Sequence, residues 1–288
     1  MGAIRHSMLI ESVPSVDYGW LDELPVVPGA PNLRLGLRSL DEATWLIRDE
    51  LTESLLDAKP LILADHPEFV QTQEGSEPAC TELLELVEAF VGERSAYRDT
   101  HDPIDAAARL VDEDLCVMAR NGPQSSDTWN LVAGSLSFPN QWLLADKIGG
   151  SLLAIHGPIE GYAEQLGAKT DAFFDALRVD RPMWRRNWFF HDDDSYVQPS
   201  KSIQRTITST DDIEPLWLRS ERETLRLLPR TGAIVFTIKT QIAPLSAIAM
   251  RPVVAEGIAN YLEQATPAGL RGKDADGRSD VLIAFLRR

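Results

Sequence analysis

Alternating apolar and polar positions predict β-strands in five segments of the chain. The clearest is residues 233–245, where Ile234, Phe236 and Ile238 should point to one face. Because several of these segments flank short turn-like sequences, we expect two antiparallel hairpins. The strand segments are 115–120 and 128–138, which flank residues 121–127, then 183–191, and finally 215–228 and 233–245, which flank residues 229–232.

Apolar residues at helical spacing predict helices in the N-terminal third and in the middle of the chain. Asp41 is a suitable cap for a first helix, which Lys59-Pro60 would end. Pro139 is suited to the first turn of a helix over residues 140–150. The apolar positions are Trp45, Leu46, Leu51 and Leu55 in the first helix and Leu83, Leu84, Val87, Phe90 and Val91 in a second, and a further helix is expected over residues 162–177.

The order of these elements predicts an α+β fold with a mostly antiparallel sheet. Two strands come first, a helical insertion follows the second strand, and three strands complete the sheet, which is the order of a PAS-type domain. Residues 1–31 contain four prolines and few periodic apolar positions, so we expect an extended arm there. Residues 32–288 contain no repeat or linker, and we expect one PAS-like domain with an N-terminal helical extension.

Composition limits the partners and cofactors. The formal net charge of −16 disfavours nucleic acid and anionic lipid as partners. The sequence has no secretory-signal pattern and no apolar stretch long enough to span a membrane, so we expect a cytoplasmic protein without a membrane partner. The two cysteines, Cys80 and Cys116, are too few for a disulfide framework, a cysteine zinc site or a four-cysteine iron–sulfur cluster. A redox centre in this chain would need histidine or an organic cofactor.

The five histidines form no spacing pattern typical of a metal site. His6 lies in the expected arm, and His66 and His101 lie beside prolines, so we expect these three to be solvated. His156 ends the apolar run GGSLLAIH and precedes a glycine and a proline, a setting that could present a ring nitrogen to a flat cofactor. Haem iron needs only one such ligand. From the residues alone, a core histidine bonded to a carbonyl group is the favoured interpretation.

Three segments, in order, resemble the haem-dependent oxidative N-demethylase family. Residues 142–162, WLLADKIGGSLLAIHGPIEGY, resemble a family segment in which a lysine-isoleucine-glycine run leads to an isoleucine-histidine-x-proline motif. RRNW at 185–188 and LRSERETLRLLPRTGAIVFTIKT at 218–240 are similar to two further family signatures, and weaker similarity reaches residues 35–50. The resemblance implies haem b in a PAS-like fold, electrons from a reductase, and oxidation of a methylamine by dioxygen with release of formaldehyde.

The resemblance also implies roles for individual residues. His156 would be the axial ligand of the haem iron, and Arg219, Glu221 and Arg222 would lie on a strand that faces the site. Residues three apart on a strand point to opposite faces, so only one arginine can reach the haem edge without a bulge. We favour Arg222, with Glu221 as a second catalytic candidate and Arg219 in a structural ion pair. Further contacts to the haem propionates are expected from Lys147, Arg186 and Asn187.

Three positions depart from the family pattern. Glu160 stands where a proline is usual, Glu223 where a glutamine is usual, and Gln241 near a usual tyrosine. If these positions line the substrate pocket, the substrate could differ from a simple methylamine. His191 follows an aromatic run and could take a distal or second axial role, although a loop position at a strand end is the simpler interpretation.

The favoured function is a haem-dependent monooxygenase that attacks a carbon next to an amine nitrogen. The chain has no dinucleotide or phosphate-loop motif, so electrons are expected from an external flavin and iron–sulfur reductase. One alternative is a PAS-like haem sensor without turnover, although no kinase, cyclase or DNA-binding pattern follows residue 242. The other alternative is a member that has lost haem and serves as a partner subunit.

Overall fold

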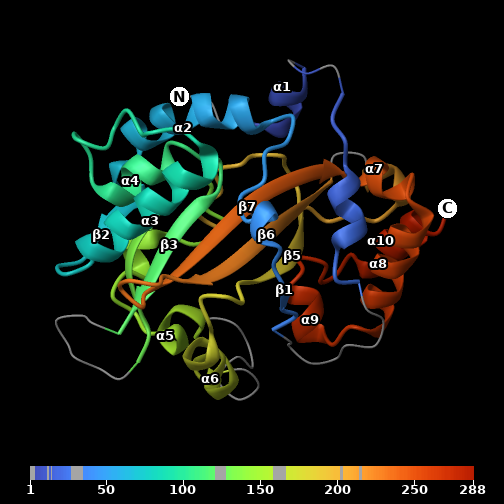
Figure 1. The fold of residues 1–288 in the computed structure, drawn as a ribbon. Coiled ribbons are helices and arrows are strands. Elements are labelled where there is room, and N and C mark those ends of the chain that lie inside the picture. Colours follow the sequence, from blue (N-terminus) through green and yellow to red (C-terminus); the bar gives the residue numbers. More distant parts are fainter. Residues whose placement is uncertain are drawn as a thin grey trace.

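The protein has an α+β fold built around one sheet (Figure 1). The computed structural model describes residues 4–11, 13, 15–26, 35–120, 128–157, 167–201, 204–213 and 216–288. Within them, seven strands form an antiparallel sheet in the order β1 (Arg38–Ser39), β5 (Met183–His191), β6 (Trp217–Leu227), β7 (Ile234–Pro244), β3 (Asp114–Ala119), β4 (Asn130–Ser135) and β2 (Val70–Thr72). The predicted fold class is confirmed, and the narrower PAS-type topology stays a prediction.

Both predicted hairpins are present. β6 pairs with β7 from Trp217 opposite Pro244 to Leu227 opposite Ile234. Gly232 adopts a φ of 69° in the turn between them, a conformation that glycine reaches without strain. β3 pairs with β4, and the turn predicted between them, residues 121–127, lies outside the described residues. These long, local pairings fix the register of the central strands.

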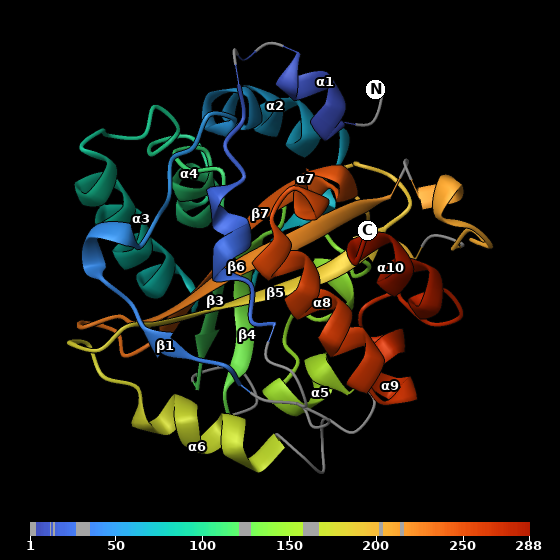
Figure 2. The same ribbon diagram turned by 90° about the vertical axis from the view of Figure 1, so that its right-hand side faces the viewer.

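Alternate residues of the strands point to one face of the sheet, which α5 (Leu152–His156) and α6 (Ala168–Ala176) cover. Cys116 of β3 and Ile238 of β7 share a buried apolar cluster with Leu152 of α5. The 3-10 turn η4 (Leu144–Asp146) belongs to the same layer. Both α5 and α6 lie below the sheet in each view (Figures 1 and 2). We call this side the α5 face and the other side the opposite face.

Two groups of helices cover the opposite face. Near β3, Val117 and Val235 pack in a cluster with α3 and α4. At the other end of the β6–β7 hairpin, Leu218 packs in a cluster with C-terminal helices (Figure 1). The helices are α3 (Glu77–Val91), α4 (Pro103–Ala108), α7 (Leu245–Ala249), α8 (Pro252–Gln264), α9 (Pro267–Arg271) and α10 (Ser279–Leu286). The predicted second helix is thus confirmed as α3, and no helix in the described part of the chain has the length and apolar character to cross a bilayer.

The prediction for the first helix is wrong in its bounds. Asp41 does act as a cap, but only for the 3-10 turn η2 (Glu42–Thr44). The helix α2 (Thr52–Asp65) begins later and continues through Pro60. A proline inside a helix removes one backbone donor and bends the axis. The buried apolar side chains of α2 pack against the body of the protein, and this packing outweighs the local cost.

The middle region is less helical than predicted. Pro139 begins no helix, and residues 140–150 contain only η4. Asn140 instead pairs with Gln198 as an isolated bridge, and Gln141 adopts a φ of 60°, which interrupts a helix. The helix predicted over residues 162–177 is described from Ala168 as α6, since the structure describes nothing of residues 158–166.

The N-terminal segment contains α1 (His6–Ile10) and the 3-10 turn η1 (Gly19–Glu23). His6, which we expected to be solvated, is only 1% exposed. Its ring nitrogens lie 3.3 Å from the hydroxyl of Tyr196 and 3.1 Å from that of Tyr18. Burial lowers the pKa of His6 to about 4. The remaining short 3-10 turns are η3 (Pro67–Phe69) and η6 (Thr210–Ile213).

Candidate functional site

His156 is the last residue of α5, and the local sequence explains how it is presented. Gly149 adopts a φ of 79°, and a Cβ atom on Gly150 would lie 2.9 Å from a backbone carbonyl oxygen. The turn before α5 therefore needs both glycines. Ser151 then caps the helix by accepting a backbone hydrogen bond at 3.2 Å. The segment delivers a half-buried histidine at the end of a short helix.

The ring of His156 is held in one tautomer. Its Nδ1 lies 2.9 Å from the carbonyl oxygen of Leu152, and because a carbonyl only accepts, Nδ1 carries the proton. Burial lowers the pKa of His156, and the positive charges of Arg185 and Lys147 lower it further. The hydrogen bond to Leu152 and the charge of Glu223 act in the other direction. The ring is therefore neutral at neutral pH, with its lone pair on Nε2. This is the form in which histidine binds a metal.

Charged side chains of the α5 face lie within electrostatic range of His156. Arg185 and Glu223 are opposite each other on β5 and β6, and Arg185 Nε donates to Glu223 Oε2 at 2.5 Å. Lys147 Nζ lies 4.6 Å from the ring centroid of Trp142. Two cations and one buried carboxylate thus share the neighbourhood of the imidazole.

Glu221 lies two positions from Glu223 on β6 and points to the same face. Asn140 Nδ2 donates to its Oε1 at 2.8 Å, and Arg219 Nε lies 3.5 Å from that same oxygen. Burial raises the pKa of Glu221, and the charge of Arg219 acts in the other direction. Glu221 therefore holds a proton more readily than an exposed glutamate does.

Arg219 connects three other segments of the chain through hydrogen bonds. It is 1% exposed, and its Nη1 donates to the carbonyl oxygen of Tyr196 at 3.0 Å. Its Nη2 donates to the carbonyl oxygen of Phe138 at 2.5 Å and to the hydroxyl of Thr240 at 3.1 Å. These bonds fix the guanidinium group beside Glu221, with which it forms an ion pair.

The structure does not bring Arg222 together with His156. Arg222 points to the opposite face, where its Nη2 donates to the carbonyl oxygen of Thr44 at 2.7 Å and its Nη1 to that of Trp45 at 3.2 Å. Its guanidinium carbon lies 5.1 Å from the ring centroid of Trp184. Arg219 and Arg222 do point to opposite faces as predicted, but Arg219 is the one on the α5 face.

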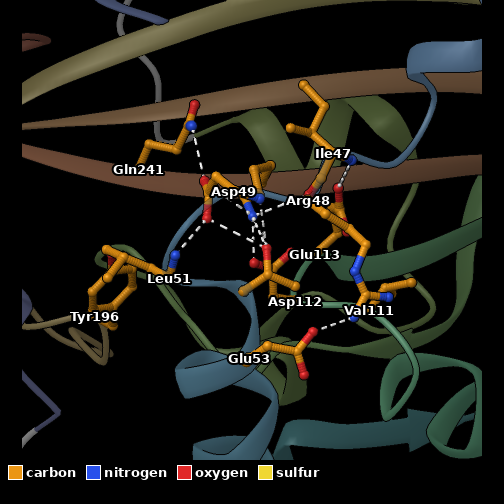
Figure 3. A network of polar contacts seen from close by, with 12 residues as sticks. Ile47, Arg48, Asp49, Leu51, Glu53, Val111, Asp112, Glu113, Tyr196 and Gln241 are labelled. Carbon is orange, nitrogen blue, oxygen red and sulfur yellow. Dashed lines mark hydrogen bonds and ion pairs between the residues drawn. The ribbon is translucent and has the colours of Figure 1, made fainter. Parts of the chain in front are cut away.

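Arg186 and Gln241 also point to the opposite face. Arg186 Nη2 donates to Glu23 Oε2 at 2.6 Å, and its Nη1 donates to Gln241 Oε1 at 2.9 Å. Gln241 Nε2 in turn donates to Asp49 Oδ2 at 3.2 Å, as Figure 3 shows. Lys239 Nζ lies 3.3 Å from that carboxylate oxygen. Arg186 and Gln241 therefore belong to a polar network on the opposite face, away from His156.

Lys273 is not among the residues predicted from the sequence, and the loop after α9 brings it to β5. Its Nζ donates to Asn187 Oδ1 at 2.7 Å and to the carbonyl oxygen of Trp188 at 2.9 Å. Asn187 lies opposite Glu221 in the strand register, so Lys273 approaches the same region of the α5 face. Burial lowers the pKa of Lys273 to about 7, and the charge of Arg185 adds to this effect. The sequence around it reads as an ordinary polar loop and gave no signal.

Two strained residues meet beside these contacts. Gln141 and Asp274 have φ values of 60° and 52°, and Gln141 Nε2 donates to Asp274 Oδ2 at 2.9 Å. Asp274 Oδ1 accepts a second bond from Gln204 at 2.8 Å. Residues other than glycine rarely adopt this conformation, which costs about 1–3 kcal/mol each and is concentrated at functional sites. The pair lies next in sequence to Asn140 and Lys273, which contact the site.

His191 is the last residue of β5 rather than a loop residue, and it is buried, at 3% exposure. Its Nδ1 lies 2.5 Å from Gln198 Oε1. Burial lowers the pKa of His191 to about 4, with the charge of Arg219 as the next cause. By strand alternation it points to the α5 face, as Arg185 and Asn187 do.

These residues fit a haem group. A haem needs an uncharged imidazole nitrogen for its iron and cations for its propionates. His156 supplies the first, and Lys147 and Arg185 are cations near its ring. The apolar cluster around Cys116, Ile238 and Leu144 lies on the same face of the sheet. Glu160 lies outside the described residues.

The sequence profile of one protein family matches residues 90–283. The family is described as "Haem-dependent oxidative N-demethylase, alpha subunit-like". The matched range includes α5 with His156 and the strands β3 to β7. A search of curated proteins gave no match.

Proposed function

The chain belongs to the family of haem-dependent oxidative N-demethylases, alpha subunit-like, and from this premise we propose that it removes a methyl group from an amine nitrogen. Membership of the family makes it a haem-dependent oxidative enzyme. Our proposal adds the cofactor haem b, dioxygen as oxidant, an external reductase as electron donor, and formaldehyde as product.

The observation that carries the proposal is the state of His156. Its Nδ1 is held by the Leu152 carbonyl oxygen at 2.9 Å and its pKa is lowered by burial, so Nε2 can bind iron without first losing a proton. A carbonyl bonded to the far nitrogen of a ligand histidine also fixes the ring orientation. The proposal therefore assigns His156 as the axial ligand.

Lys147 and Arg185 are the proposed contacts of the propionates. Both are cations whose charge lowers the pKa of His156. An arginine can bind a carboxylate through two parallel bonds, although Arg185 would share its guanidinium with Glu223. Arg186 and Arg222, which we expected at this edge, point to the opposite face and take no part in the proposal.

Glu221 is the proposed contact of the amine. When bound, haem supplies the oxidative chemistry, and the chain has to orient the substrate and exclude water. Glu221 has a side chain 13% exposed and a raised pKa, so it can accept a hydrogen bond from an amine or take up its proton. Attack at carbon requires the neutral amine, and a carboxylate that holds the released proton favours that form.

The first test is a visible spectrum of the purified protein before and after reduction. We expect a Soret band that shifts on reduction, and loss of this band and of bound iron in His156→Ala. The exposed His101 offers a matched control, since His101→Ala should keep both. A His156→Ala variant with unchanged haem content would show that His156 is not the ligand.

The second test is turnover of N-methyl amines by the reduced protein in the presence of dioxygen. Formaldehyde should form in amounts that match the demethylated amine. A haem-loaded and reducible protein that converts none of a broad amine panel would favour the haem sensor instead.

A further inference from the structure

His191 is held in one tautomer by the amide of Gln198. Gln198 Nε2 lies 3.2 Å from Asp193 Oδ1 and 3.0 Å from the carbonyl oxygen of Ser195. Both of these oxygens only accept, so Nε2 must be the donor and Oε1 must face His191. Because Oε1 also only accepts, Nδ1 of His191 carries the proton. In the neutral ring, the lone pair is therefore on Nε2.

This lone pair is buried and unused. His191 is 3% exposed, and its Nε2 has no hydrogen-bond partner among the described residues. Leaving a buried acceptor unpaired is unfavourable, so such atoms are rare in folded proteins. An acceptor that is retained in this way indicates a partner outside the chain.

Two more buried polar atoms in the same region are unsatisfied. Asn140 Oδ1 has no hydrogen-bond partner in the described part of the chain. The same holds for Arg219 Nε, whose contact with Glu221 Oε1 is an ion pair at 3.5 Å. Asn140 Nδ2 donates to that same Glu221 oxygen at 2.8 Å. The Asn140 amide and Arg219 Nε are therefore neighbours.

The strand register places His191 beside them. Phe189 lies directly opposite Arg219, so His191 is the diagonal neighbour of Arg219, within reach of a long side chain. The backbone of Asn140 also pairs with that of Gln198, which holds the His191 ring. The register and these contacts bring the side chains of His191, Asn140 and Arg219 to one region of the α5 face, near the Glu221 carboxyl group.

We propose that His191, Asn140 and Arg219 bind a small guest that donates N–H or O–H bonds to the first two and accepts a bond from the third. A water molecule can make all three bonds, which is typical of buried water. A neutral primary amine can make all three, a secondary amine can donate only one, and a tertiary amine can donate none. The guest is an ordered water or the nitrogen of the substrate amine, and only the second identity rests on the proposed function.

Crystals of the purified protein, grown without amine and then soaked in methylamine or trimethylamine, test the site directly. We expect density within about 3.2 Å of His191 Nε2, Asn140 Oδ1 and Arg219 Nε, the range of ordinary hydrogen bonds. Density that is equally present without amine identifies water. Density that gains a methyl group in methylamine, but not in trimethylamine, identifies the amine. An empty site in all three crystals would overturn the proposal.

The tautomer can be checked in solution without any substitution. In protein with ¹⁵N-labelled histidine, the Nε2 resonance of His191 should be that of an unprotonated nitrogen. A proton on Nε2 would overturn the proposal, because the atom could then accept no bond. His191→Phe should lose the guest in crystals, with His101→Phe as the matched control that keeps it.

The outcome separates this inference from the proposed function. A guest bound at this site in a protein that binds no haem would support the site and contradict the proposed enzymatic function. A haem-loaded, active protein with no guest would support the proposed function and contradict the site.

Discussion

Lys59 illustrates how single charges are stabilised inside this protein. Its side chain has no exposed surface, and its Nζ donates to three backbone carbonyl oxygens, of Ala108, Val111 and Glu113, at 3.1, 2.7 and 2.5 Å. All three ammonium protons are thus satisfied. Burial lowers the pKa of Lys59. No sequence pattern distinguishes such a lysine from an exposed one, which is why the buried charges of this protein could not be predicted.

Glu113 gives a prediction for the pH dependence of stability. It is 1% exposed, and its Oε1 accepts from the backbone N of Ile47 at 2.9 Å (Figure 3). Burial raises its pKa from 4.5 to about 7, with Asp112 as the next cause. Between these values the folded state binds more protons than the unfolded state, so this residue lowers stability as pH rises from about 4.5 to 7.

Glu113→Gln should therefore gain stability relative to wild type as pH rises through this window. The relative gain is at most about 1.4 kcal/mol per pH unit, the limit for one proton. Urea unfolding at several pH values measures it, and Glu50→Gln at an exposed carboxylate is the control. A difference that stays constant from pH 4.5 to 7 would contradict the raised pKa.

Arg219 and Arg222 allow the assignment of faces to be tested. Arg219→Met removes the donor of two buried carbonyl groups and the ion-pair partner of Glu221, so it should lower the unfolding free energy by about 3–5 kcal/mol and weaken haem binding. Arg222→Met loses two bonds on the opposite face, at a cost of about 1–3 kcal/mol, and should leave haem affinity within about twofold. Haem titration, followed at the Soret band below the unfolding temperature, measures this. Loss of haem from the Arg222 variant alone would reverse the assignment.

At the scale of elements, the strands were predictable and several helices were not. β5 has the predicted bounds, because alternation along nine residues reports directly on a half-buried strand. Helix ends depend on contacts that are distant in sequence. α2 continues through Pro60 because its apolar side is buried, and residues 140–150 form little helix because Asn140 pairs with Gln198. Neither contact leaves a local pattern.

Gly134 gives a prediction for the packing of η4 on the sheet. A Cβ atom at this position would lie 2.8 Å from one methyl carbon of Leu144 and 3.1 Å from the other. Leu144 is 1% exposed and has little room to move. Gly134→Ala should therefore lower the unfolding free energy by about 1–3 kcal/mol, as overpacking does.

The double variant Gly134→Ala with Leu144→Ala identifies the cause. Shortening the Leu144 side chain makes room for the new methyl group. The double variant should therefore lose less unfolding free energy than the two single variants lose together. Urea unfolding of the four proteins in this cycle provides the numbers. Strict additivity would show that the clash with Leu144 is not the reason for the loss.

At the scale of the whole molecule, the candidate site combines distant segments. The sequence pointed to His156 and Glu221 through motifs on one helix and one strand. It could not point to Lys273, or to the bond between Gln141 and Asp274, because these residues meet only when the loop after α9 packs against β5. Motifs within a segment survive in the sequence, whereas contacts between segments are created by the fold.

The last prediction concerns electron supply. Cys80 and Cys116 are both buried, on α3 and β3, and burial raises the pKa of each to about 12. A buried thiol with a raised pKa is a poor metal ligand, because the thiolate is the binding form. Because of the two buried cysteines and the lack of a nucleotide motif in the sequence, we expect that NADPH alone does not reduce a haem in this chain.

The purified, haem-loaded protein should therefore be inactive with NADPH and dioxygen alone. Adding a flavin and iron–sulfur reductase, or a chemical reductant with a mediator, should give formaldehyde from dimethylamine or a larger N-methyl compound. Boiled reductase serves as the control for contaminating reductant. The larger compounds belong in the assay because Glu223, where a glutamine is usual, lies on the α5 face with Glu221 and leaves open a different substrate. Formaldehyde produced with NADPH alone would show that this chain accepts electrons without a partner.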